Sequence, residues 1–149
     1  MSAKSIYSYT VKREKAGTLH EDTGPLCTPD AAAAFLRAIG LHDLEQEHFV
    51  TLLLDTKHKV KGYAPVTVGL VDQCPVHSRE VFRTAILLGA SQVMLGHNHP
   101  SGDPTPSKED IEMTKAMVGA GRIIGIDVLD HIVLGGQRHS SLRAMGHMG

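Results

Sequence analysis

The stretch at residues 96–110 reads GHNHPSGDPTPSKED and follows residues 92–95, a short apolar segment typical of a buried strand. Ser107 is suited to cap a helix that runs from there to about residue 119 or 121. A strand, a loop rich in Gly and Pro and a helix therefore follow one another directly. The polar residues of the stretch form the pattern H-x-H-x₇-S-x-x-D, made by His97, His99, Ser107 and Asp110.

This spacing predicts a metal site. Because side chains alternate along a strand, His97 and His99 are expected on one face, and Asp110 falls in the first turn of the following helix. Two imidazoles and one carboxylate are a ligand set that hydrolytic zinc sites use, with a fourth position left for water. Taken alone, Ser107-x-x-Asp110 is better interpreted as a capping box with Asp in place of the usual Glu or Gln. The two histidines upstream favour the metal site, because a cap does not require them.

Composition limits the classes of function. A chain of 149 residues is expected to form one domain with a substantial core. The formal net charge of -1 does not support a surface that coats nucleic acid, although a local basic patch stays open. Cys27 and Cys74 lack a C-x-x-C spacing, which favours a reduced, cytoplasmic setting. We expect neither a signal peptide nor a membrane span, because no apolar run is long enough.

The first half of the chain predicts a terminal strand, a helix and a hairpin. We expect an N-terminal strand and connecting loop over residues 1–28, with the strand at 6–11 on a sheet edge. Thr28 and Pro29 open a helix that stops at Gly40. Residues 49–54 form a buried strand, and a turn at 55–58 leads into a second strand at 60–71. Pro65 and Gly69 indicate a bulge or an edge in that second strand.

The second half adds two helices and further strands. Ser78 is expected to cap a helix whose apolar stripe consists of Val81, Phe82, Ala85 and Leu88. After the helix that starts at Ser107, residues 123–134 contain two short strand candidates, and residues 140–149 are expected to form a loose tail. The order of elements predicts an α/β domain over residues 29–149 with a mixed central sheet flanked by helices.

The stretch around the histidines resembles the signature of the JAMM (JAB1/MPN+) metalloproteases, and most closely the RadC-like branch. The resemblance also covers VHSREVFRTAILLGASQVMLGHNHPSGDPTPSKEDIEMTK, GIDVLDHIVLGG and SLR, and extends over roughly residues 28–145. It implies a single JAB/MPN-like domain, related to the cytidine-deaminase fold. It further implies Zn²⁺ held by His97, His99 and Asp110, Ser107 near the oxyanion, and an upstream Glu that acts through the zinc-bound water.

Three residues are candidates for that upstream Glu: Glu45, Glu47 and Glu80. We assign Glu47, because it stands just before the buried strand at 49–54 and in the E-H-F context typical of RadC-like chains. Glu80 falls on a helix beside Arg79, which favours a surface or ion-pair role. His131 lies in an apolar segment next to Asp130, so it is interpreted as a structural residue or as a partner of a metal ligand.

Three functions follow from the resemblance. The first is a zinc-dependent peptidase or isopeptidase of JAMM type with Glu47 and Ser107 as catalytic residues and an unidentified peptide or isopeptide substrate. The second is a RadC-type DNA-repair or DNA-processing protein, but residues 1–28 are too short for the helix-hairpin-helix module of that family. The third is a non-catalytic interaction domain, ranked last because the ligand pattern is complete. The N-terminal edge strand would also suit a homodimer.

Overall fold

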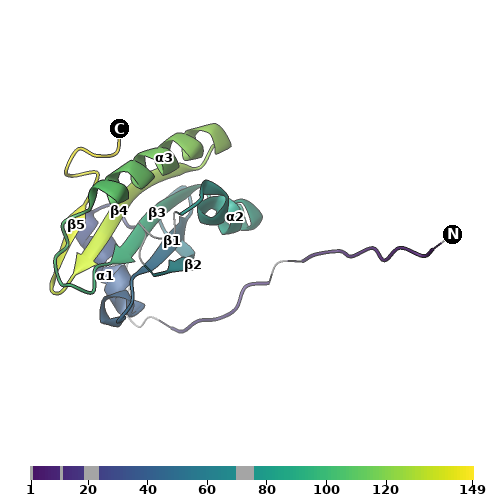
Figure 1. Cartoon of the computed structure of the whole chain (residues 1–149), viewed down its shortest axis with the longest axis horizontal. Coiled ribbons are helices and arrows are strands. Elements are labelled where there is room, and N and C mark those ends of the chain that lie inside the picture. Colours follow the sequence, from purple (N-terminus) through teal and green to yellow (C-terminus); the bar gives the residue numbers. More distant parts are fainter. Residues whose placement is uncertain (1, 11, 19–23, 70–75) are drawn as a thin grey trace.

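A five-stranded sheet forms the centre of the computed structural model, which describes residues 2–10, 12–18, 24–69 and 76–149 (Figure 1). The strands lie in the order β2-β1-β3-β4-β5. Neighbouring strands are antiparallel, except that β3 and β4 run parallel and are joined by a helical crossover, as a parallel pair requires. The predicted α/β class with a mixed sheet is therefore confirmed. The strands are β1 (His48–Leu54), β2 (Val60–Val68), β3 (Gln92–Asn98), β4 (Asp127–Gly135) and β5 (Arg138–Ser141).

Helices cover both faces of this sheet. Helix α1 (Pro29–Ala38) packs on one face, where Leu36 meets Leu52 and Met94. Helices α2 (Ser78–Leu88) and α3 (Lys108–Ile124) pack on the other, where Phe82 and Met117 belong to a second core. Strands β1 and β3 supply alternate residues to the two cores, which is why both read as continuous apolar runs. A single turn of 3₁₀ helix, η1 (Leu41–Asp43), links α1 to the segment before β1.

Local hydrogen bonds confirm one predicted helix cap and one predicted turn. Thr28 Oγ1 accepts from Ala31 N at 3.1 Å, so α1 begins with the expected cap, and Gly40 after it adopts φ 86°. In the β1–β2 hairpin, Asp55 Oδ1 accepts from the amides of Lys57 and Lys59. Strand β2 is an edge strand with a register shift near Pro65, as expected, and it ends at Val68. Residues 70 and 71 of the strand expected at 60–71 lie outside the described residues, and so does Cys74.

Several expectations about elements are wrong. Residues 6–10 form no strand, and Ile6 is 94% exposed. Alternation alone does not make a strand there, because no strand among the described residues pairs with this segment. The homodimer expected from this segment stays a prediction. Ser78 is the first residue of α2 and not its cap, since the N-cap position belongs to His77. Leu88, at 36% exposure, lies off the buried stripe of α2.

The C-terminal part is more ordered than the sequence indicated. Strand β3 continues through Asn98, α3 extends to Ile124, and β4 is one strand where two short ones were expected. The polar pair Asp130-His131 does not interrupt β4, because the buried Asp130 carboxylate accepts from His131 N at 2.7 Å and from Ser141 Oγ at 2.6 Å. The expected loose tail instead contributes to β5, and Leu142 is fully buried. Among the described helices, none combines the length and apolarity needed to cross a bilayer.

Candidate metal centre

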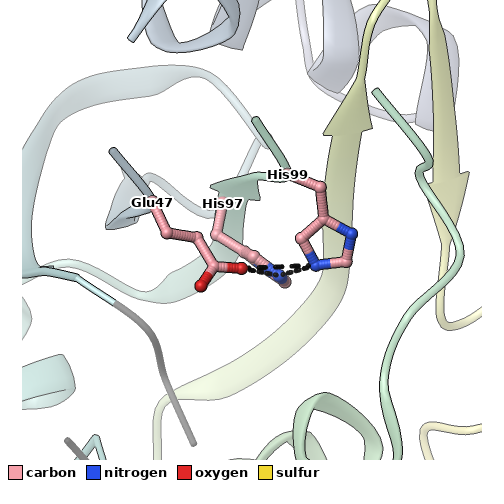
Figure 2. Close-up of side chains that lie close together, drawn as sticks. All are labelled: Glu47, His97 and His99. Carbon is pink, nitrogen blue, oxygen red and sulfur yellow. Dashed lines mark hydrogen bonds and ion pairs between the residues drawn. The ribbon is translucent and has the colours of Figure 1, made fainter. Parts of the chain in front are cut away.

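Strand register brings the predicted site residues together at one end of the sheet. Phe49 of β1 pairs with His97 of β3 in antiparallel register, so Glu47, two residues before Phe49, lies beside His99, two residues after His97. Figure 2 shows these three side chains pointing toward one another from the two chain segments. Asp110 reaches the same point from the first turn of α3. The site therefore combines residues from before β1, from the end of β3 and from a helix start.

The distances among the polar atoms fit a metal ion. The Nε2 atoms of His97 and His99 lie 2.9 Å apart, and Asp110 Oδ2 lies 3.4 and 3.2 Å from them. Tetrahedral coordination with bonds of about 2.0–2.1 Å places ligand atoms about 3.3–3.4 Å apart, close to these separations. Glu47 Oε1 lies 3.8 Å from His97 Nε2 and 3.4 Å from His99 Nε2. Glu47, His97 and His99 alone form a group that could hold a metal ion, with all ligand atoms within 4.8 Å of one another.

Two carboxylates and two imidazoles, all largely buried, create a strongly polar site. The side chains of His97 and Asp110 are 0% and 2% exposed, and those of His99 and Glu47 are 14% and 10% exposed. Burial opposes ionisation of Asp110, yet the neighbouring imidazoles hold the pKa of this carboxyl well below its ordinary value. The hydrogen bond with Asp110 in turn raises the pKa of His99. Asp110 is therefore an anion that stabilises positive charge between the two imidazoles.

Both histidines are oriented by partners on their far side. His99 Nδ1 lies 2.8 Å from the carbonyl oxygen of Asp103, which can only accept, so His99 donates there and directs Nε2 into the site. His97 Nδ1 lies 2.7 Å from Nε2 of His131, whose own Nδ1 lies 2.6 Å from Thr114 Oγ1. Such outer partners fix ring orientation in metal sites. His131 is fully buried, and burial lowers its pKa well below the ordinary value.

Ser107 and Asp110 form the capping box that was the alternative interpretation of their spacing. Ser107 Oγ accepts from Asp110 N at 3.0 Å, and Asp110 Oδ2 accepts from Ser107 N at 2.8 Å. The same Oδ2 atom faces the two histidines. Asp110 therefore caps the start of α3 and faces the site with the same carboxylate oxygen. Ser107 is exposed at the helix start, and its catalytic role stays a prediction.

The other expected carboxylates lie elsewhere. Glu80 is in the first turn of α2, and Glu45 is exposed in the segment before β1. Asp103 faces His99 with its backbone carbonyl, while its carboxylate accepts from Thr105 N at 3.0 Å. Of the three glutamates considered, Glu47 is the one with a carboxylate oxygen beside both imidazoles.

Sequence reasoning did not assign a supporting role in the site to Asn98 or to Thr114. Asn98 is 2% exposed, accepts from His48 N at 2.7 Å and donates to Gln46 O at 3.0 Å, so it holds the segment that carries Glu47. A polar residue between two histidines in an apolar strand was the available signal. Thr114 is fully buried one helical turn after Asp110, and its spacing of four residues could have indicated a shared face.

Comparison with known proteins agrees with this architecture. The sequence-family model of the RadC-like JAB domain matches residues 26–147 of this chain. A UPF0758 protein of Desulforamulus reducens is 51% identical over 106 residues, which are 71% of this chain and 47% of that protein. A UPF0758 protein of Bacillus cereus strain AH187 is 39% identical over 147 residues, or 99% of this chain and 65% of that protein.

A third relative, a UPF0758 protein of Bacillus anthracis strain A0248, is 40% identical over 143 residues, covering 96% of this chain and 63% of its own length. The chain thus spans about half to two thirds of the length of these curated relatives. Their names state no activity. The domain match and the identities together show that the chain belongs to the RadC-like JAB domain family.

Proposed function

We propose that this chain is a zinc-dependent hydrolase of JAMM type that cleaves peptide or isopeptide bonds. The observation that carries the proposal is the convergence of His97, His99 and Asp110 at about the spacing of tetrahedral ligands, with the Glu47 carboxylate at the rim. His97, His99 and Asp110 would hold the ion. Two imidazole nitrogens and one carboxylate oxygen suit zinc, which uses this ligand class in open catalytic sites.

Each residue of the proposed active site then has a defined role. A bound zinc ion would supply Lewis acidity, which polarises a carbonyl and acidifies water. Glu47 Oε1 accepts a proton from the attacking water and later delivers it to the nitrogen of the leaving amine. The carboxylate is suited to both steps because it is 10% exposed and lies within 4 Å of both imidazoles. Ser107, exposed at the start of α3, donates its hydroxyl hydrogen to the oxyanion that develops on the substrate.

Metal content and activity of matched variants test this proposal. The parent protein should bind one equivalent of zinc, and His97→Ala should lose it. Glu47→Gln should keep the zinc and lose activity on internally quenched peptides or on lysine-linked isopeptides by about 10²–10⁴-fold. Glu80→Gln is the control, since Glu80 lies on α2, and should match the parent in both respects. If Glu47→Gln loses the metal, Glu47 is a ligand and not a base. If Glu47→Gln stays fully active, the proposed mechanism is wrong.

The DNA alternative remains a separate proposal. Zinc chemistry does not dictate the electrophile, so the same residues could act on a phosphodiester. The formal net charge of -1 does not favour it. Gel shifts with single- and double-stranded DNA at low salt would decide, because binding that weakens as salt rises would support a DNA role and absence of binding would remove it.

A further inference from the structure

A buried chain of hydrogen bonds leads from the candidate metal centre to the backbone of α3 and back to the same centre. His97 Nδ1 lies 2.7 Å from His131 Nε2, and His131 Nδ1 lies 2.6 Å from Thr114 Oγ1. Thr114 Oγ1 in turn donates to the carbonyl oxygen of Asp110 at 2.6 Å. His97, His131 and Thr114 are 0% exposed and Asp110 is 2% exposed, so water does not compete for these atoms.

The direction of each hydrogen bond follows from counting hydrogens. A carbonyl oxygen only accepts, so the one hydroxyl hydrogen of Thr114 points to Asp110. Thr114 Oγ1 is then an acceptor toward His131, and His131 Nδ1 carries the hydrogen of that bond. A neutral imidazole has a single N–H, so His131 Nε2 is a bare acceptor. It must accept from His97 Nδ1, which leaves Nε2 of a neutral His97 without a hydrogen.

The same count applies to the second histidine. His99 donates from Nδ1 to the Asp103 carbonyl, so in its neutral form Nε2 also carries only a lone pair. The two Nε2 lone pairs then face each other at 2.9 Å, with the Asp110 carboxylate 3.4 and 3.2 Å away. Three electron-rich atoms at this spacing repel one another unless a positive charge, which a proton or a metal ion can supply, lies between them. The hydrogen-bond chain thus prepares His97 to bind a positive ion.

We propose that Thr114 and His131 are positioning residues that set the tautomer of His97, so that its Nε2 lone pair is presented to a metal ion. The proposal rests on the proposed function for the metal centre and for the identity of its ion. Thr114 fixes the direction of all the hydrogen bonds in this series because its hydroxyl donates to one acceptor, the carbonyl oxygen of Asp110. Without that hydroxyl, the His131 hydrogen has no partner at Nδ1 and moves to Nε2. It then donates to His97 Nδ1, which transfers the His97 hydrogen to Nε2, where it competes with the metal ion for the lone pair.

Three variants of buried threonines test this directly. Thr114→Val removes the hydroxyl and keeps the shape of the side chain, while Thr114→Ser keeps a hydroxyl and should preserve the series of hydrogen bonds. Thr51→Val is the matched control, because Thr51 is also 0% exposed and its Oγ1 has no hydrogen-bond partner among the described residues. We expect Thr114→Val to weaken zinc affinity by about 10–100-fold in chelator competition. Thr114→Ser and Thr51→Val should stay within about twofold of the parent.

Nitrogen-15 correlation spectra of the histidine rings in metal-free protein provide the second readout. The parent, Thr114→Ser and Thr51→Val should show His97 with its hydrogen on Nδ1, and Thr114→Val should shift that hydrogen to Nε2. A parent spectrum with the hydrogen on Nε2 overturns the proposal even if Thr114→Val fails to fold. Equal affinity and tautomer in Thr114→Val and Thr51→Val overturn it as well. A parent that binds no zinc but shows the expected tautomer refutes the metal centre and leaves the hydrogen-bond chain standing.

Discussion

Gly135, the last residue of β4, lets the loop between His99 and α3 approach the sheet. A Cβ atom at this position would lie 2.4 Å from Pro104 N, 2.6 Å from Asp103 C and 2.9 Å from Pro104 Cα. All three are backbone atoms, so no side chain can rotate away, and the loop itself would have to move. Asp103 also supplies the carbonyl oxygen that accepts from His99 Nδ1. Gly135→Ala should therefore disturb both stability and the candidate metal centre.

The size of the effect follows from the geometry. Ordinary contact begins at 3.4 Å, so the backbone at Pro104 must retreat by about 1 Å. Overpacking of this kind costs about 1–3 kcal/mol. Loss of the hydrogen bond between His99 and Asp103 adds about 1 kcal/mol. For a chain of 149 residues, the combined loss lowers Tm by roughly 5–15 °C.

Thermal unfolding followed by circular dichroism, with zinc affinity measured in parallel, checks this prediction. Gly119→Ala is the control, because a Cβ at Gly119 meets nothing within 4 Å and the residue lies inside α3. Alanine in a helix interior stabilises by about 0.5–1 kcal/mol relative to glycine, so the two variants should shift Tm in opposite directions. An unchanged Tm and zinc affinity in Gly135→Ala would refute the reasoning, since the loop would then have moved without cost.

Three further predictions concern the helix cap, pH and the β4–β5 hairpin. Ser107→Ala should lower the free energy of unfolding by about 1 kcal/mol and Ser107→Gly by only a few tenths, measured in urea; equal losses would argue against the cap. In metal-free protein, the stabilising contribution of Asp110, whose pKa is lowered, is complete above pH 3.8 and is lost on acidification. That of His99, whose pKa is raised, is complete below pH 6.5 and is lost as pH rises through the raised value. The urea midpoint of the parent should therefore be highest between pH 3.8 and pH 6.5, and this pH dependence should become weaker in Asp110→Asn. A urea midpoint of the parent that does not change with pH would contradict the pairing of Asp110 with His99. Arg37 donates to Gly136 O at 2.8 Å and to Arg138 O at 3.0 Å. Arg37→Lys should therefore lower the free energy of unfolding by about 1 kcal/mol in the same urea titration. An unchanged free energy of unfolding would contradict a stabilising role for these two guanidinium hydrogen bonds.

Features that depend on neighbouring residues were predictable from the sequence. The caps at Thr28 and Ser107, the hairpin at Asp55 and the apolar strand β1 all follow from hydrogen bonds or periodicity within a few residues. The spacing of His97, His99 and Asp110 also belongs to this class, because a strand end and a helix start joined by a short loop bring them together. These parts of the site needed no knowledge of distant contacts.

Features that depend on partners far along the chain were decided only by the tertiary structure. Residues 6–10 alternate like a strand but pair with no strand in the part of the chain that the structure describes, whereas β5 forms because β4 pairs with it. The sequence left three glutamates as candidates, and the antiparallel register of β1 with β3 is what brings Glu47 to the histidines. The hydrogen bond of His131 with His97 joins residues 34 positions apart. Sheet pairing and burial determine such contacts, and neither is written in local periodicity.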